Sequence, residues 1–379
     1  MQNSTLPDST DIIETPYLML DVQRLDNNIK RMRAKLAPFN VTLRPHVKTN
    51  KSLEVTARLF AGEPGPITVS TLREADYFFA AGYTDILYGV AISPNKFDHA
   101  ARLIGAGCRL LCILDNLDTA LALAAYAERT AINFAVLLEI DCDGHRSGLP
   151  PRSPVLLDIA RLMQHGKVHF RGVMTHAGNS YFCRSADALE QCAREERDAV
   201  VNSADMLRQA GFAVDIISVG STPTALFVRD LTGVTEVRAG VFAFFDLVMA
   251  GLGVCRLEDI ALSVVTTVIG HQADKGWTIV DAGWMALSRD RGTAAQAIDQ
   301  GYGVVCDMHG RPIADLILQG ANQEHGIIAS RSGTGAPPSL PIGALLRILP
   351  NHACATAAQY NGYYLAGTER AYWPRINGW

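Results

Sequence analysis

Two short stretches, roughly 300 residues apart, carry side chains that could do chemistry. Near the start, the string Arg44-Pro-His-Val-Lys-Thr-Asn-Lys51 places Lys48 just past an apolar run, and near the end Asn351-His-Ala-Cys-Ala-Thr356 places His352 and Cys354 two residues apart. In an extended segment these two side chains would share one face. A lysine amine can form a Schiff base, and imidazole with thiolate suits a borderline divalent metal. Together they predict an enzyme that handles an amino acid.

The elements that must position Lys48 are eight short apolar runs that alternate with Ala- and Leu-rich helical segments. Eight βα units with buried, β-branched strands favour a (β/α)8 TIM-type barrel over an open doubly wound sheet. The runs cover residues 41–47, 67–71, 85–90, 110–115, 134–140, 170–176, 215–221 and 236–245.

After residue 253 the sequence changes to strand-like runs separated by Gly, Pro and Asp, which predicts a mainly-β domain. The extended segment 17–21 could cross over to join it. We therefore expect a barrel over residues 23–251 and a C-terminal β domain over 252–379, which strand 1–22 joins. The predicted strands of the second domain cover residues 261–270, 277–282, 301–307, 316–318, 344–349 and 363–366.

Charge and composition argue against several classes of protein. With 34 basic and 38 acidic residues the net charge is −4, so neither nucleic acid nor a membrane surface is an expected partner. The N-terminal segment lacks the pattern of a signal peptide and no run of about 18 apolar residues appears, so we expect a cytoplasmic protein. The eight cysteines show no CxxC spacing, and no disulfide framework is predicted.

Active sites of such barrels lie at the C-terminal ends of the strands, which is where the first polar candidates fall. Lys48 could be an ordinary solvated lysine, but in a pocket it would be desolvated, and its pKa lowered, so that the amine becomes nucleophilic. The tripeptide Gly220-Ser-Thr222 could be a simple turn. After strand seven, beside Gly240 after strand eight, it lies where barrels commonly bind phosphate.

The pair His352 and Cys354 also has a plain alternative, a satisfied core histidine beside a buried thiol. A structural zinc site would need four protein ligands, and no second such pair lies nearby in the sequence. Two protein ligands leave positions open for water or substrate. The pair therefore predicts a catalytic metal site.

At these residues the chain resembles the fold-type III pyridoxal-phosphate enzymes, which include alanine racemase and a branch that acts on D-3-hydroxy amino acids. The likeness runs over essentially the whole chain. It is carried by Thr15-Pro16, His46-Val-Lys-Thr49, Ser70-Thr-Leu-Arg-Glu-Ala75, Asp143-Gly-His-Arg-Ser-Gly148, Gly220-Ser-Thr222, Arg238-Ala-Gly240, Asp281-Ala-Gly283 and Glu324-His-Gly326.

Within that branch the aldolases have a histidine and an aspartate as the metal pair, whereas this chain has histidine and cysteine. It therefore looks like the D-serine and D-threo-3-hydroxyaspartate dehydratases, and two longer strings, Gly270-His-Gln-Ala-Asp-Lys-Gly-Trp277 and Gly320-Ala-Asn-Gln-Glu-His-Gly326, are most similar to the hydroxyaspartate enzymes.

The resemblance implies a role for each site residue. Lys48 would hold pyridoxal 5'-phosphate, and His176 would belong to the same cofactor site. Arg146 would lie beside the phenolic oxygen and Tyr181 would approach the pyridine nitrogen. The phosphate would be bound by Ser221, Thr222 and Gly240, and a divalent ion (Zn, Mn, Co or Mg) by His352 and Cys354.

The implied activity is β-elimination of water from a D-3-hydroxy amino acid, with Lys48 as the base and the metal as a Lewis acid at the β-hydroxyl. D-threo-3-hydroxyaspartate would give oxaloacetate and ammonia, and D-serine and D-threonine are further possible substrates. We expect a homodimer. The alternatives are an aldolase that cleaves the Cα–Cβ bond, an amino-acid racemase, and a non-catalytic pyridoxal-phosphate carrier.

Overall fold

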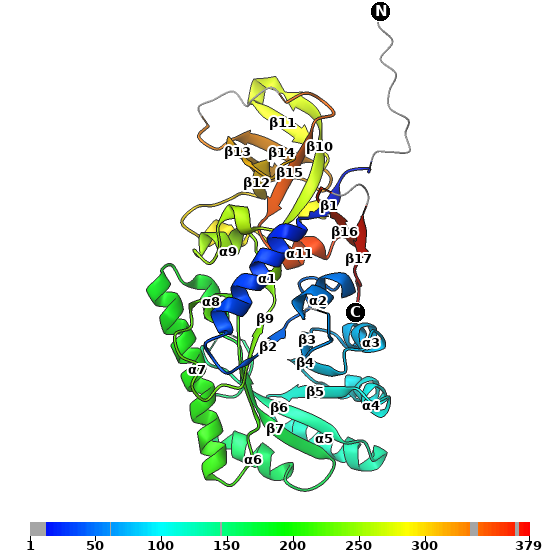
Figure 1. The fold of residues 1–379 in the computed structure, drawn as a ribbon, viewed down its shortest axis with the longest axis vertical. Coiled ribbons are helices and arrows are strands. Elements are labelled where there is room, and N and C mark those ends of the chain that lie inside the picture. Colours follow the sequence, from blue (N-terminus) through cyan, green and yellow to red (C-terminus); the bar gives the residue numbers. More distant parts are fainter. Residues whose placement is uncertain (1–12, 61, 145, 334–339, 368–370) are drawn as a thin grey trace, which may run out of the picture.

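The computed structural model describes residues 13–60, 62–144, 146–333, 340–367 and 371–379. Its larger part is a sheet of eight parallel strands in the order β2-β9-β8-β7-β6-β5-β4-β3. A bridge between His46, just after β2, and Thr68 in β3 closes this sheet into the predicted barrel (Figure 1). The strands are β2 (Thr42–Pro45), β3 (Ile67–Val69), β4 (Asp85–Ala91), β5 (Arg109–Leu114), β6 (Phe134–Ile140), β7 (Val168–Thr175), β8 (Ile216–Val219) and β9 (Glu236–Ala239).

Helices alternate with the barrel strands, and several begin at a side chain that accepts a backbone N–H. Asp21, Thr71, Asn116 and Ser185 cap the helices that follow them in this way. The helices are α1 (Val22–Leu36), α2 (Leu53–Leu59), α3 (Leu72–Ala80), α4 (Phe97–Gly105), α5 (Leu117–Thr130), α6 (Pro154–Leu162), α7 (Ala186–Gln209), α8 (Thr222–Phe227) and α9 (Leu247–Gly251), with short 3-10 turns η1 (Pro94–Lys96), η2 (Gly178–Phe182) and η3 (Val241–Ala243).

The interior of the barrel is apolar on one side and charged on the other. Strands β4 to β7 contribute a compact apolar cluster made of Leu87, Leu111, Ile113, Leu137 and Met174. Strands β2, β8 and β9 instead contribute buried polar side chains. The barrel is thus a filled core rather than a channel, as the fold requires.

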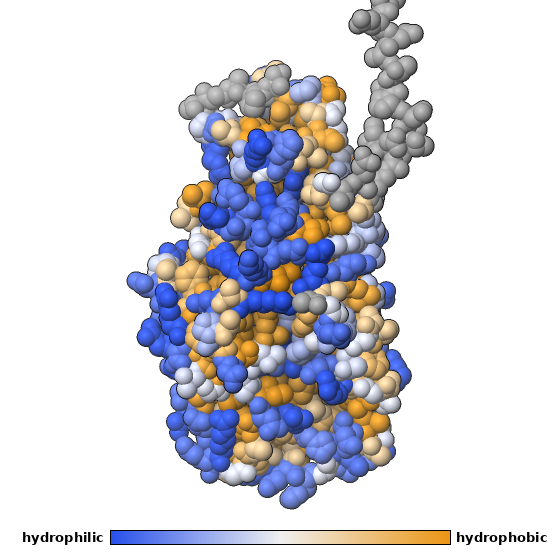
Figure 2. All heavy atoms as spheres, viewed as in Figure 1, coloured by the Kyte–Doolittle hydropathy of each residue, from blue (hydrophilic) through white to orange (hydrophobic). Residues whose placement is uncertain are grey.

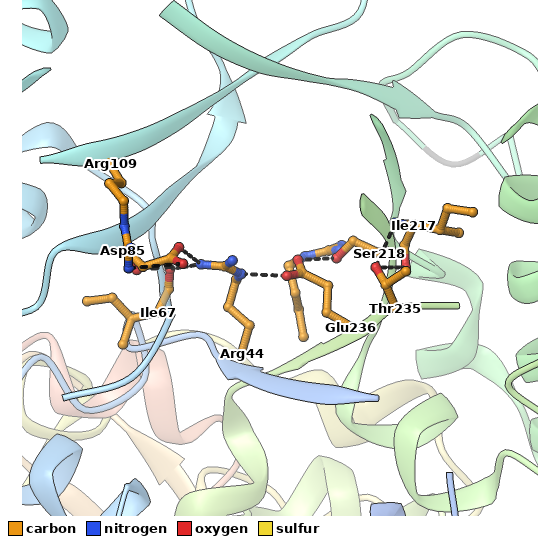
Figure 3. Close-up of polar contacts among 9 residues, drawn as sticks. Arg44, Ile67, Asp85, Arg109, Ile217, Ser218, Thr235 and Glu236 are labelled. Carbon is orange, nitrogen blue, oxygen red and sulfur yellow. Dashed lines mark hydrogen bonds and ion pairs between the residues drawn. The ribbon is translucent and has the colours of Figure 1, made fainter. Parts of the chain in front are cut away.

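The charged side of the interior is built around Arg44, of which only 4% is exposed. Its guanidinium lies 2.9 Å from a Glu236 carboxylate oxygen and 2.6 Å from an Asp85 carboxylate oxygen (Figure 3). Ser218 donates to the other oxygen of Glu236 at 2.6 Å. Arg238 continues the chain, because it donates to Ser218 and to the carbonyl of Thr175 at the end of β7. Buried charges are therefore paired, and the network leads from the bottom of the barrel to the strand ends.

The second part of the molecule is a nine-stranded sheet in the order β11-β14-β13-β12-β15-β10-β1-β16-β17, and β10 also pairs with β11. This is the predicted β domain, although the sequence did not reveal β14 and β17. Its elements are β1 (Tyr17–Leu20), β10 (Leu262–Gln272), β11 (Trp277–Val280), β12 (Gly303–Cys306), β13 (Pro312–Ala321), β14 (Gly326–Ser330), β15 (Leu345–Pro350), β16 (Gly362–Leu365), β17 (Tyr372–Pro374), α10 (Trp284–Leu287), α11 (Ala353–Ala357), η4 (Leu257–Asp259), η5 (Ala273–Lys275) and η6 (Gly292–Ala295).

The N-terminal strand β1 belongs to this second sheet, whereas residues 1–12 of the predicted joining segment lie outside the described residues. β1 pairs antiparallel with β10 and parallel with β16, before α1 leads into the barrel. Asp281 fixes this arrangement because it accepts hydrogen bonds from the hydroxyls of Thr15 and Thr266 at 2.5 and 2.6 Å. The motif that begins at Asp281 therefore anchors the start of the described chain.

Helices α9 and α11 lie where the barrel meets the β domain (Figure 1). On the face shown in Figure 2, hydrophilic side chains gather over this junction. Among the described residues, no helix has the length and apolar character needed to cross a membrane.

Candidate active site

Lys48 lies on a tight loop directly after β2, at the C-terminal end of the barrel. Backbone N–H groups of this loop bind both neighbouring strands: His46 donates to Ala239 at 2.8 Å, and Val47 donates to Thr68 at 2.9 Å. The side chain of Lys48 is exposed in the single chain. The burial expected for a lysine inside a pocket is therefore not seen in the single chain. The loop is fixed but leaves the amine accessible.

His46 and His176 lie near this amine, and both imidazoles are held neutral. Burial, together with the positive charge of Arg146, lowers the pKa of His176 to about 3. Burial likewise holds the pKa of His46 well below its ordinary value, and the positive charges of Lys48 and Arg238 add to the effect. The charge of Lys48 acts on both rings, which places the three groups around one space.

The tautomer of His176 follows from its partner. Its Nδ1 lies 2.7 Å from the backbone carbonyl of Gly220. A carbonyl can only accept, so Nδ1 carries the proton and Nε2 keeps its lone pair. His176 is therefore a neutral ring fixed through Gly220.

Tyr181 and Arg146 border the same space. The Tyr181 ring, on η2, lies 6.4 Å from the His176 ring, centroid to centroid. Burial raises the pKa of its phenol, so the hydroxyl stays protonated and can donate a hydrogen bond. Arg146 is exposed, and its cation lowers the pKa of His176, which places it over the same mouth.

The predicted phosphate residues lie together, but two of their hydroxyls already have partners. The Ser221 hydroxyl accepts from the Thr224 N–H and lies 3.0 Å from the Ser180 hydroxyl. The Thr222 hydroxyl accepts from the Phe242 N–H at 3.2 Å, which ties the start of α8 to η3. These hydroxyls occupy the N–H groups of Thr224 and Phe242, and Pro223 has none, so this corner offers an anion the N–H groups of Thr222 and Val241 at the starts of α8 and η3.

Gly240 packs against the lysine loop so closely that no side chain fits there. A Cβ at this position would lie 2.7 Å from the His46 carbonyl oxygen and 3.0 Å from the Thr49 hydroxyl. The end of β9 and the loop after β2 are thus held at backbone contact. This brings the predicted phosphate corner next to Lys48.

Glu196 is a residue of this site that the sequence did not indicate. It is buried on α7, with 2% exposed, and accepts the N–H groups of Ala177 at 3.0 Å and Gly220 at 2.9 Å. Burial raises the pKa of its carboxyl group, although these hydrogen bonds oppose the shift. One carboxylate thereby joins the loops that carry His176 and Ser221. The only sequence signal is a glutamate on the inner face of a long helix.

His352 and Cys354, the proposed metal pair, lie at the start of a helix and not in the extended segment in which they would have shared one face. His352 is the extended N-cap of α11, and Cys354 belongs to its first turn. The three alanines at positions 353, 355 and 357 favour the helix. The two side chains nevertheless meet, because a hydrogen bond joins them.

His352 and Cys354 each shift the pKa of the other toward its charged form. Burial opposes both charges, but His352 holds the pKa of the Cys354 thiol below its usual value, while Cys354 and Asp290 raise the pKa of His352. His352 Nδ1 lies 2.6 Å from an Asp290 oxygen, so Nε2 is the nitrogen that faces the sulfur. Nε2 and Sγ are therefore the two atoms of this pair that could bind a divalent ion.

The metal pair and the lysine loop are in direct contact. The sulfur of Cys354 lies 3.3 Å from the hydroxyl of Thr49, the residue after Lys48. The buried carboxylate of Asp246, at the N-cap of α9, accepts the N–H of Ala353 at 2.9 Å. The structure thus brings the two ends of the chain into one site.

These residues fit both groups that the sequence implied. For pyridoxal phosphate the barrel mouth offers the accessible amine of Lys48, the neutral ring of His176 and the cation of Arg146. The backbone N–H groups at the starts of α8 and η3 are available to its phosphate. For the metal, the donor atoms are Nε2 and Sγ. Within the described part of the chain, no cluster of three or more His, Cys, Asp or Glu side chains could hold a metal. A bound ion would therefore keep open positions.

Comparison with known proteins agrees with this architecture. The family model described as the alanine racemase N-terminal domain matches residues 20–248, and that described as a putative serine dehydratase domain matches residues 261–366. D-threo-3-hydroxyaspartate dehydratase from Delftia sp. (strain HT23) is 50% identical over 99% of this chain and 100% of its own. Its crystal structure superposes with a TM-score of 0.94 at 51% identity, covering 97% of this chain and 98% of that one.

More distant relatives belong to both reaction types. D-serine dehydratase from Dictyostelium discoideum is 30% identical over 96% of this chain and 95% of its own. D-threonine aldolase from an Arthrobacter species is 27% identical over 92% of this chain and 88% of its own. The barrel, the β domain and the extent of these matches lead to one assignment: the chain belongs to the fold-type III pyridoxal-phosphate enzymes, in the branch of the D-serine and D-threo-3-hydroxyaspartate dehydratases.

Proposed function

We propose that this chain is a pyridoxal-phosphate- and metal-dependent dehydratase that eliminates water from a D-3-hydroxy amino acid, preferentially D-threo-3-hydroxyaspartate. The observation that carries the proposal is the contact between Thr49 and Cys354, which puts the lysine loop and the metal pair in one site. The 50% identity to D-threo-3-hydroxyaspartate dehydratase supports the substrate. In this proposal residues 23–251 bind the cofactor, and residues 252–379 carry the metal pair.

Pyridoxal phosphate, when bound, supplies an electron sink that acidifies the substrate Cα–H, and a divalent ion supplies a Lewis acid for the leaving hydroxyl. Lys48 would hold the cofactor, and its amine would then accept the Cα proton at Nζ. His176 would offer a neutral ring face, fixed through Gly220. The Arg146 cation and the Tyr181 phenol would orient the bound groups at the barrel mouth.

Ser221, Thr222 and Gly240 would build the phosphate corner, with backbone N–H groups as the main donors. His352 and Cys354 would hold the metal (Zn, Mn, Co or Mg) through Nε2 and Sγ. A solved structure of D-threo-3-hydroxyaspartate dehydratase is of a cysteine-to-alanine variant in the metal-free form, which supports a metal near Cys354.

The competing reaction is cleavage of the Cα–Cβ bond, which the same groups could serve. Incubation with D-threo-3-hydroxyaspartate separates the two. We expect ammonia and oxaloacetate in equal amounts, whereas glycine and glyoxylate would refute elimination. Activity should disappear with a chelator and return with a divalent ion, which neither a racemase nor a cofactor carrier requires.

We further infer a cytoplasmic homodimer. The eight cysteines are free thiols, as a reducing compartment would keep them. At one end of the β domain Ile269, Ile342 and Leu345 are 43%, 69% and 39% exposed, and a second copy is the occupant we propose for this patch. Light scattering should give twice the mass of the chain, and Ile342→Asp should lower it to that of a monomer.

A further inference from the structure

Asp290 lies beside the proposed metal pair, on the loop between α10 and η6. Its Oδ2 atom is 2.6 Å from His352 Nδ1, and the two side chains are 44% and 40% exposed. No sequence motif drew attention to this residue. Its contact with His352 is nevertheless among the shortest polar contacts around the site.

The contact decides which nitrogen of His352 can bind a metal. A carboxylate can only accept a hydrogen bond, so the proton on Nδ1 is held by Asp290. Nε2, which faces Cys354, is then the nitrogen whose proton a metal can replace. A carboxylate behind a metal-binding imidazole fixes the ring orientation and makes the ligand nitrogen more basic.

The loop holds the carboxylate in this position. Ser288 has a left-handed backbone, with φ +77°, and its hydroxyl accepts the Asp290 N–H at 3.0 Å. The Gly292 N–H donates to the Asp290 carboxylate. A Cβ at Gly292 would lie 2.7 Å from a Val248 methyl group, so the loop packs directly on α9.

The same loop is also bonded to the residue before His352. Asn351 is buried, and its side-chain oxygen Oδ1 accepts the N–H and the hydroxyl of Thr293 at 3.1 and 2.5 Å. Its amide donates to the Gly301 carbonyl at 2.8 Å. The positions of Asp290 and His352 are therefore set by one connected piece of structure.

We propose that Asp290 is the positioning residue of the metal site, orienting His352 so that Nε2 and the Cys354 sulfur bind one divalent ion. The inference rests on the proposed metal site. Asp290 touches neither substrate nor cofactor in this scheme, and it acts through His352. Its loss should weaken metal binding about 10- to 100-fold.

The test is a zinc titration of chelator-treated holoenzyme in competition with a chelating dye. We expect Asp290→Ala to raise the Kd for Zn²⁺ about 10- to 100-fold. Asp290→Asn, whose amide oxygen can still accept from Nδ1, should lie between Asp290→Ala and the unchanged protein. The visible absorbance of the bound cofactor and the thermal midpoint should stay unchanged, since a merely structural defect would move both.

Two controls separate this inference from the metal site itself. Asp299→Asn removes an exposed carboxylate that pairs with Arg291 at 2.6 Å on the same loop, and it should leave the Kd for Zn²⁺ unchanged. His352→Ala should abolish tight binding. If His352→Ala still binds zinc tightly, the proposed metal site is wrong. The other refuting result concerns Asp290 alone. If His352→Ala loses tight zinc binding but Asp290→Ala and Asp290→Asn both bind zinc as tightly as the unchanged protein, the role of Asp290 is refuted and the metal site stands.

Discussion

Replacing His176 by asparagine should change how the stability of the cofactor-free protein depends on pH. The folded protein lowers the pKa of His176 from 6.5 to about 3, mainly through burial. Between these values the unfolded chain binds a proton that the folded chain does not. The contribution of neutral His176 to the stability of the fold is therefore complete above the pKa of histidine in the unfolded chain. It is lost as the pH falls below that pKa. An amide at position 176 has no such proton to bind.

The size of the effect follows from the two pKa values. Between pH 7 and pH 5 the linkage relation gives a loss of about 2 kcal/mol for a histidine shifted from 6.5 to about 3. The contribution of Glu196 to folding stability changes with pH in the opposite direction. Burial raises the pKa of its carboxyl group, so this contribution diminishes as the pH rises. Glu196 is present in both proteins, so the difference between them isolates His176.

The assay is urea unfolding followed by circular dichroism at pH 7, 6 and 5, after removal of the cofactor. The stability difference between the unchanged protein and His176→Asn should shift by about 2 kcal/mol toward the variant on going from pH 7 to pH 5. His165→Asn, at an exposed histidine, should show no such shift. A difference that stays constant with pH would refute the neutral, buried state of His176. NMR of ¹⁵N-labelled histidine gives an independent check, since the His176 ring should remain neutral at pH 5.

Three further substitutions and one control test the candidate site and the buried charges of the barrel beneath it. Lys48→Ala should abolish the visible absorbance of the bound cofactor and lower ammonia release at least about 10²- to 10⁴-fold. Gly240→Ala adds a Cβ 2.7 Å from a backbone carbonyl oxygen; it should cost about 1–3 kcal/mol in denaturant unfolding and weaken cofactor binding in a titration. Glu236→Leu leaves the buried Arg44 without its more buried partner and should cost about 3–5 kcal/mol. Arg109→Ala, at a side chain 72% exposed, should cost less than about 1 kcal/mol by the same measurement.

The strands of the barrel could be predicted because burial on both faces leaves a plain trace in the sequence. Each of the eight barrel strands overlaps one of the apolar runs predicted between helical segments. β14 and β17 were missed for a physical reason. β14 lacks a regular alternation of buried and less buried side chains, and β17 has only three residues, so neighbouring strands rather than local pattern define them.

The active site was predictable only where a residue type carries its own chemistry. A lysine after a barrel strand and a histidine beside a cysteine are visible in sequence, so Lys48, His352 and Cys354 could be named as candidates. Glu196 and Asp290 could not, because a carboxylate has many ordinary uses. What distinguishes them is their partners: backbone N–H groups for Glu196 and an imidazole for Asp290. Those contacts join elements far apart in the chain.

The closure of the barrel explains how residues from opposite ends of the chain form one site. β9, the last barrel strand, pairs with β2, the first, so the chain leaves the barrel beside the loop that carries Lys48. It then runs directly into Asp246, which caps α9 and also binds the N–H of Ala353. The β domain is thereby fixed at the barrel mouth with Cys354 against Thr49. An aspartate at position 354 would keep a metal ligand in the same place. In the proposed metal site the thiolate of Cys354 is the softer donor and would favour borderline ions such as zinc.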